Sequence, residues 1–176
     1  GYSQVGGRPC QWVSDSCSKD VSSQLRANVS KVYSNAAAFA ALKKDGSVVT
    51  YGNIKCGGAP CVYDAIKKQC TTSVADKLTK DVIAIFSNFY AFIALKVDGS
   101  IVSWGDYRYG GSTSLVANEL RNISFVFGSS DYDAQSHYPN SYDSCPSGEH
   151  IYGINNTGNL MINSSNYTCT ACSLSL

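Results

Sequence analysis

Two carboxylates that stand beside glycines are the first residues of this chain whose types could do chemistry. One is Asp45-Gly46 in ALKKDGSVVTYG, and the other is Asp98-Gly99 in ALKVDGSIVSWG. A carboxylate beside a glycine can hold a metal ion, because the backbone can approach the ligand closely. The two stretches lie 53 residues apart, however, and such recurrence indicates a repeated turn. A more divergent third copy has Thr157-Gly158 at this point and lacks the carboxylate. Because the glycine is kept and the carboxylate is not, we expect all three to be hairpin turns.

A second group of candidate residues lies in the segment SSDYDAQSHYPNSYDSCPSGEH, residues 129–150. Tyrosines alternate there with carboxylates and amides. Aromatic faces suit sugar rings, and clustered carboxylates suit Ca²⁺. The candidate ligand loop consists of Asp131, Tyr132, Asp133, Tyr138 and Tyr142. We prefer the competing interpretation of a polar surface loop, because long loops often have this composition.

Enzyme chemistry finds little support in the sequence. His137 and His150 lie in or beside the same segment, and a hydrolase could in principle use them with nearby carboxylates. The chain contains no GxSxG, HExxH or P-loop pattern. Its one CxxC, Cys169–Cys172, lacks a second pair at zinc-binding spacing. We therefore expect no enzyme activity, no metal ion and no cofactor.

The charge and hydropathy of the chain exclude two classes of partner. The sequence has 14 Lys+Arg against 13 Asp+Glu, whereas proteins that bind nucleic acids normally carry a basic excess. No apolar run approaches the roughly 18 residues that a membrane-spanning helix needs. We therefore expect no nucleic-acid partner and no membrane insertion.

The cysteines and glycosylation motifs indicate the compartment. Eight cysteines in 176 residues is a high, even number that predicts disulfides. Five Asn-x-Ser/Thr motifs predict covalent N-glycans, and their asparagines are Asn28, Asn122, Asn155, Asn163 and Asn166. The two features together predict a secreted protein that is extracellular or at the cell surface.

Three copies of one unit account for most of the chain. They are placed at residues 1–50, 51–103 and 104–163 of a single repeat domain, 1–163, with an insertion at 129–150 and a cysteine-rich tail at 164–176. Each copy has a glycine-rich turn, a short helical pattern, a β-type run and a hairpin. The predicted N-caps of the helices are Ser18, Thr71 and Thr113.

The predicted fold class is mainly β. It consists of three tandem blade-like repeats, each with strands, an Asp-Gly hairpin and one short helix, arranged as an open array or a partial propeller. Asp-Gly between apolar runs predicts a type I′ turn, which needs a positive φ at both central residues. Disulfides are expected to staple the repeats.

Equivalent positions in the repeats should form equivalent disulfides. GGRPC at 6–10 and GGAPC at 57–61 are each followed by another cysteine. This predicts the pairs Cys10–Cys17 and Cys61–Cys70. For the other four cysteines we expect Cys145–Cys169 and then Cys56–Cys172, although Cys172 could equally bond outside this chain.

The stretches FAALKKDGSVVTYGNIKCGG and FIALKVDGSIVSWGDYRYGG resemble the repeat of the regulator-of-chromosome-condensation family. The closer resemblance is to a variant of that repeat with a helical SxxVxxxL segment, found in large proteins of algae, other protists and bacteria. The resemblance implies propeller-type blades. The nuclear exchange function of some members is not expected here, because three units fall short of the four to eight blades of a closed propeller. The tail CPSGEHI…YTCTAC resembles cysteine-rich modules of extracellular receptors, which implies an extracellular location.

Three strand-rich units in a row leave two end units without a neighbour on one side. Neither residues 1–7 nor residues 173–176 have the character of a polar cap. Head-to-tail contact between such ends gives a filament unless a rotation closes it into a ring. We therefore expect a secreted structural glycoprotein that associates with copies of itself, head to tail, into a filament, surface hair or matrix. The alternative is an extracellular carbohydrate-binding or adhesion module that binds glycans through the 129–150 insertion.

Overall fold

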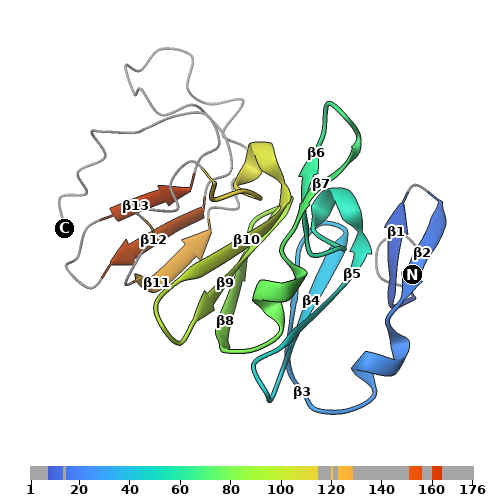
Figure 1. Ribbon diagram of the computed structural model, residues 1–176, viewed down its shortest axis with the longest axis horizontal. Coiled ribbons are helices and arrows are strands. Elements are labelled where there is room, and N and C mark those ends of the chain that lie inside the picture. Colours follow the sequence, from blue (N-terminus) through green and yellow to red (C-terminus); the bar gives the residue numbers. More distant parts are fainter. Residues whose placement is uncertain are drawn as a thin grey trace.

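The computed structural model of the chain describes residues 8–13, 15–114, 120, 123–128, 151–155 and 160–163. For residues 124–128, 151–155 and 160–163 it describes the backbone. The described residues form three β-sheets that follow one another along the molecule in sequence order (Figure 1). The prediction of a mainly β protein is therefore confirmed. The insertion at 129–150 and the tail at 164–176 lie outside the described residues.

The first two sheets have five strands each and the same topology. The first has the order β2-β1-β5-β4-β3. Its strands are β1 (Cys10–Val13), β2 (Ser16–Asp20), β3 (Val29–Ser34), β4 (Ala38–Lys43) and β5 (Val48–Asn53). The second has the order β7-β6-β10-β9-β8. Its strands are β6 (Cys61–Asp64), β7 (Gln69–Ser73), β8 (Val82–Ser87), β9 (Ala91–Lys96) and β10 (Ile101–Asp106).

The third sheet has the order β11-β12-β13, with β11 (Ile123–Gly128), β12 (Ile151–Asn155) and β13 (Leu160–Asn163). Both five-stranded sheets are mixed, because β1 pairs with β5 and β6 pairs with β10 in parallel. In each of these sheets, the aromatic-glycine pair lies in the second strand of the hairpin, Tyr51-Gly52 in β5 and Trp104-Gly105 in β10.

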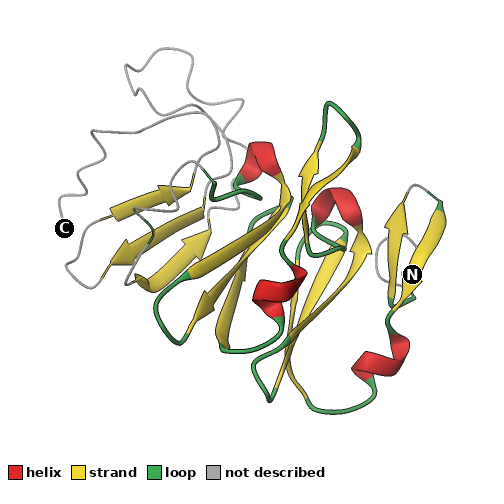
Figure 2. Cartoon of the chain, viewed as in Figure 1, coloured by secondary structure: helices red, strands yellow, loops and turns green. Residues whose placement is uncertain are grey.

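The helices of the described chain are single 3₁₀ turns (Figure 2). They are η2 (Ser22–Leu25), η3 (Ile54–Cys56), η4 (Ala75–Leu78) and η5 (Tyr107–Tyr109). The turns η2 and η4 occupy the predicted helical positions of the first two copies. Two of the three predicted N-caps are wrong, because Ser18 and Thr71 lie in strands β2 and β7. The helical segment predicted after Thr113 includes residues 115–119, which lie outside the described residues. The buried residues Val21 and Val74 stand at the N-cap positions. The first N–H group of each turn, that of Ser22 or Ala75, donates to the side chain of Asp20 or Ser73.

The hairpins of the first two sheets share one turn, and it differs from the predicted type I′ turn. Gly46 has φ +78°, whereas Asp45 does not have a positive φ. The N–H of Gly46 donates to the carbonyl of Lys43 over 3.1 Å, and the N–H of Lys43 donates to the carbonyl of Ser47 over 2.8 Å. This pattern is a type I turn followed by a left-handed glycine, a common three-residue hairpin loop.

The aspartate of each hairpin has a structural role. The carboxylate of Asp45 accepts hydrogen bonds from the hydroxyl and the N–H of Ser47. Asp98 accepts the same two bonds from Ser100. These bonds, first those of the serine hydroxyls, lower the pKa of both carboxyls, because they favour the charged form. The Asp-Gly pairs are therefore turn elements, as expected from their recurrence.

The largest core cluster lies between the first and second sheets. The second sheet contributes Phe92 and Trp104, both fully buried, and the first sheet contributes small residues of β4, including Ala38 and Ala40. The indole Nε1 of Trp104 donates to the carbonyl of Gly57 over 3.0 Å, so the polar end of this side chain is satisfied. A second cluster joins β9 of the second sheet to Leu120 and Ile123.

Each hairpin turn also forms a hydrogen bond to the next sheet. The N–H of Val82 in β8 donates to the carbonyl of Gly46 over 3.0 Å. The N–H of Ile123 in β11 donates to the carbonyl of Gly99 over 2.9 Å. The turn that the two hairpins share therefore links each sheet to the next through an equivalent hydrogen bond.

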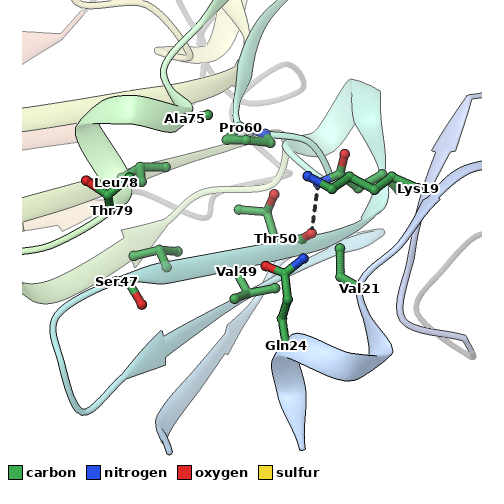
Figure 3. Close-up of a pocket in the computed structure, with 12 residues that line it drawn as sticks. Lys19, Val21, Gln24, Ser47, Val49, Thr50, Pro60, Ala75, Leu78 and Thr79 are labelled. Atoms are coloured by element: carbon green, nitrogen blue, oxygen red, sulfur yellow. Dashed lines mark hydrogen bonds between the residues drawn. The ribbon is translucent and has the colours of Figure 1, made fainter.

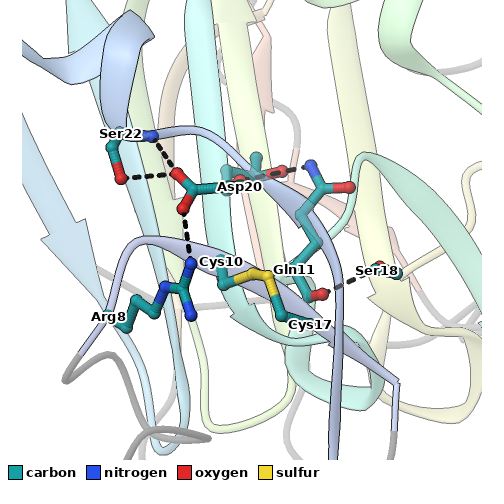
Figure 4. Close-up of a disulfide and its surroundings, with 8 residues drawn as sticks. Arg8, Cys10, Gln11, Cys17, Ser18, Asp20 and Ser22 are labelled. Atoms are coloured by element: carbon teal, nitrogen blue, oxygen red, sulfur yellow. Dashed lines mark hydrogen bonds and ion pairs between the residues drawn. A yellow bond between two sulfur atoms is a disulfide. The ribbon is translucent and has the colours of Figure 1, made fainter.

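The structure contains the disulfides Cys10–Cys17 and Cys61–Cys70, the two pairs that the repeat predicts. Each bridges the β-hairpin at the outer edge of its sheet, β1–β2 or β6–β7. Near the first disulfide, Asp20 pairs with Arg8 and accepts hydrogen bonds from Ser22, which lower its pKa to about 2 (Figure 4). Disulfides of this kind are typical of oxidising compartments.

Cys56 has a different environment. Among the described cysteines it is the free one, it is 5% exposed within the core cluster, and burial raises the pKa of its thiol to about 11. Within the described part of the chain it therefore behaves as a small apolar core residue. Its suggested partner Cys172 lies outside the described residues, and so do Cys145 and Cys169.

The change Gly46→Ala tests the link between consecutive sheets. A Cβ at this position would lie 2.8 Å from the backbone nitrogen of Asp81, at a φ that L side chains rarely adopt. We expect the free energy of unfolding to fall by about 1–3 kcal/mol. Chemical denaturation followed by tryptophan fluorescence measures this. Lys44→Ala on the same turn is the control and should change stability by less than about 0.5 kcal/mol. Equal effects of the two changes would contradict the role of Gly46.

Candidate interaction surface

The first and second sheets can be compared residue by residue, because their registers match. Phe39 pairs with Tyr51 across β4 and β5, and Phe92 pairs with Trp104 across β9 and β10. The rings stack in both sheets, with centroids 5.0 Å and 5.4 Å apart. Any difference in burial between equivalent residues therefore comes from the surroundings of the sheet.

In the second sheet, the face that carries Phe92 and Trp104 is covered by the first sheet. Both aromatic side chains are fully buried, and Ile85 on β8 is 2% exposed. The remaining apolar residues of this face are also buried: Val74, Leu78, Val82, Ala94 and Val102. This face shows how the repeat packs when a sheet precedes it.

In the first sheet, the same face is only partly covered. Val32, the equivalent of Ile85, is 54% exposed. Phe39 and Tyr51 are half-buried, although their equivalents Phe92 and Trp104 are fully buried. We call this surface the outer face. It consists of Leu25, Val29, Val32, Phe39 and Tyr51 around the buried residues Val21, Ala41 and Val49.

The hydrogen bonds that link sheets reveal the same asymmetry. In the second sheet, the N–H of Val82 donates to Gly46 of the preceding hairpin. Val29 is the equivalent of Val82 in the first sheet. Val29 is the first residue of β3 and pairs with Lys43 at the end of β4, just as Val82 is the first residue of β8 and pairs with Lys96 at the end of β9. The described residues contain no preceding hairpin that could accept a bond from Val29. The outer face therefore resembles one half of the interface that the chain forms within itself between the first and second sheets.

A cleft of about 290 Å³ lies between the first sheet and the turn η4 (Figure 3). Its polar lining comes from Gln11, Lys19, Gln24, Ser47, Thr50 and Thr79. The hydroxyl of Thr50 is buried and has no hydrogen-bond partner, which could indicate a ligand. The hydroxyl of Ser103, at the equivalent position of the second sheet, is also unpaired and buried. The unpaired hydroxyl is therefore a trait of the repeat, and the cleft is a weaker candidate than the outer face.

The residues of the predicted ligand loop, Asp131, Tyr132, Asp133, Tyr138 and Tyr142, lie outside the described residues. So do His137 and His150. Within the described part of the chain, no group of three or more His, Cys, Asp or Glu side chains is arranged to hold a metal ion. None of the described helices has the length and apolar character needed to cross a membrane.

The predicted glycosylation sites are spread over the sheets. Asn28 is exposed, has φ +63° and directly precedes β3. Asn155 ends β12 and Asn163 ends β13. Asn122 and Asn166 lie outside the described residues. Val82 and Ile123 are equivalent, because their N–H groups donate to equivalent glycines, Gly46 and Gly99. The residues directly before them in the sequence, Asp81 and Asn122, are therefore equivalent too. The matching strand registers make Asn28 the equivalent of Asp81 in the first sheet.

Comparisons with known proteins show similarity at the level of structure. No protein-family model matches the chain, and no curated protein sequence matches it. Human WBSCR16 is similar over 76% of this chain, with a TM-score of 0.45 and 14% identity. Prp20p from Saccharomyces cerevisiae is similar over 75% of it, with a TM-score of 0.44 and 11% identity. Both are regulator-of-chromosome-condensation-like β-propeller proteins, the family that the repeat motif resembles. The alignments cover 32% and 30% of those two chains.

The equivalent changes Phe39→Ala and Phe92→Ala test the asymmetry of the two faces. Phe92→Ala should lower the free energy of unfolding of the monomer by about 3–5 kcal/mol, as for a fully buried phenylalanine. Phe39→Ala should cost on the order of 1–2 kcal/mol, because its side chain is already partly exposed to water. Urea denaturation of dilute protein measures both values, and each change is the control for the other. Equal costs would show that the outer face is covered in the monomer.

Proposed function

We propose that this chain is a secreted structural glycoprotein whose copies associate end to end into an extracellular filament, surface hair or matrix. The observation that carries the proposal is the outer face of the first sheet. The same apolar residues at the same register positions are buried in the second sheet, because a preceding sheet packs on them. A second copy that supplies such a sheet would bury the outer face in the same way.

The energetic argument rests on the side chains that would lose contact with water. Phe39, Tyr51 and Val32 are partly exposed. Moving an apolar side chain from full exposure to full burial stabilises by about 1.5–3 kcal/mol, so covering these side chains would contribute a fraction of that value each. All eight residues that define the outer face are uncharged. Removal of an ionised group from water would oppose association, and none of these eight side chains carries such a group.

The predicted N-glycans are compatible with this association. The equivalent of Asn28 in the second sheet is Asp81, which directly contacts the hairpin of the preceding sheet through its backbone. Its side chain is nevertheless 51% exposed. A glycan on Asn28 would therefore extend into solvent from the edge of the contact. The sequence motifs for glycosylation and the two disulfides support an extracellular location.

The proposal gives the chain no enzymatic activity and no cofactor. Its partners are copies of itself, and it includes neither nucleic acid nor insertion into a membrane. The alternative function, carbohydrate binding or adhesion through residues 129–150, depends on residues outside the described part of the chain and stays a prediction from the sequence.

The change Val32→Asp tests the proposal, because it places a charge on the exposed part of the outer face. Wild-type protein secreted from a eukaryotic host should form particles that lengthen with concentration, as seen by sedimentation velocity and negative-stain microscopy. Val32→Asp should weaken association at least about tenfold, since an unpaired charge would be buried.

The matched control is Ile66→Asp. Ile66 is 80% exposed in the loop between β6 and β7, away from the outer face, so the same chemical change should leave assembly as in wild type. A wild-type protein that stays monomeric at every concentration would overturn the proposal. A closed particle of fixed, small copy number would contradict the filament.

A further inference from the structure

The third sheet repeats the strand pairing of the second. In the second sheet, Ile93 pairs with Ser103 and Leu95 pairs with Ile101. In the third sheet, Tyr152 pairs with Ile162 and Ile154 pairs with Leu160.

The first strands of both sheets carry the same irregularity. A bulge lies between Val82 and Ala84 in β8 and between Ile123 and Phe125 in β11. After the bulge, Ile85 pairs with Ala94 and Val126 pairs with Gly153. The registers therefore make the position of Tyr152 equivalent to that of Ile93.

These register positions have a defined role in the first two sheets. Ala40, Leu42 and Val48 of the first sheet lie against the second sheet. Ile93, Leu95 and Ile101 of the second sheet belong to the cluster that also contains Ile123 of the third. In both cases, this is the face with which a sheet covers the sheet that follows it. The corresponding positions of the third sheet are occupied by Tyr152, Ile154 and Leu160, all of which are large and apolar or aromatic.

We infer that the partner of the outer face is this set of positions on the third sheet of a second copy, so that the third sheet of one molecule packs on the first sheet of the next. We call the set Tyr152, Ile154, Leu160 and Ile162 the leading face. The inference rests on the proposed end-to-end association and adds which two surfaces meet. The contact between copies then repeats the contact that the first and second sheets form within one chain. It is heterologous, since each copy contributes a different surface.

A mixture of two variants tests this pairing of surfaces. Val32→Asp blocks the outer face and Ile154→Asp blocks the leading face. Each variant alone should be monomeric at concentrations at which wild type forms long particles. An equimolar mixture should form dimers and nothing longer, because one contact remains intact and both free ends are blocked. Sedimentation velocity should give this contact a Kd within about threefold of the wild-type value.

Other results of the mixing experiment overturn the inference. If the mixture remains monomeric where wild type polymerises, the two faces do not meet. If Ile154→Asp polymerises as wild type does, the leading face is not part of the contact. Circular dichroism first shows whether Ile154→Asp folds. If it does not, Leu160→Asp takes its place, and the cross-linking experiment below tests the same contact without any change in the third sheet.

A photo-reactive benzoylphenylalanine in place of the exposed Val32 maps the contact directly. Mixed ¹⁵N-labelled and unlabelled copies allow mass spectrometry to separate cross-links between molecules from those within one molecule. We expect cross-links between molecules to residues 151–163. The same amino acid in place of Ile66 is the control and should give none to this segment.

The cross-links also separate failure of the inference from failure of the proposed function. Cross-links to residues 25–51 of another copy would indicate a back-to-back contact and overturn the inference. Cross-links within one molecule to residues 1–7 or 164–176 would place another part of the same chain on the outer face, and this would also overturn the inference. Assembled particles without any cross-link would overturn it as well. If wild type forms no assemblies, the proposed function itself fails.

Discussion

The structure depends on the packing of one sheet face against the next. Each five-stranded sheet has two apolar faces, and a single sheet cannot bury both. The first sheet supplies small residues such as Ala38 and Ala40, and the second supplies Phe92 and Trp104, which fill the space between them. The buried thiol of Cys56 and the indole bond to Gly57 lie in this same layer.

The hairpins fix how the sheets pack. A left-handed glycine at each turn leaves its carbonyl free to accept a bond from the first strand of the following sheet, at Gly46 and Val82 and again at Gly99 and Ile123. The aspartates hold the turn through bonds to the serine two residues later. The residues that first suggested a metal site therefore serve the spacing and orientation of the repeats.

The proposed association between copies follows from the way in which the repeat packs. The chain forms the interface between sheets internally, and the described residues leave one half of it partly exposed on the first sheet. Under the proposed function, contact between copies would need no surface chemistry beyond that of the repeat itself. The disulfides lie in the outer hairpins of the sheets, and Asn28 is exposed directly before β3.

The sequence by itself determined the local structure: the strands, the glycine-centred hairpins, the disulfides Cys10–Cys17 and Cys61–Cys70 and the equivalence of the repeats. It misled on the turn type, because several hairpin turns share the Asp-Gly pair. It misled on Ser18 and Thr71 as N-caps, because the strands β2 and β7 extend past them and the capping side chains are those of Asp20 and Ser73, two residues further on. Phe39 and Phe92 have nearly the same local sequence, yet one is half-buried and the other is fully buried. Only the tertiary structure decided this difference, because burial depends on which sheet lies opposite, and that neighbour is distant in sequence.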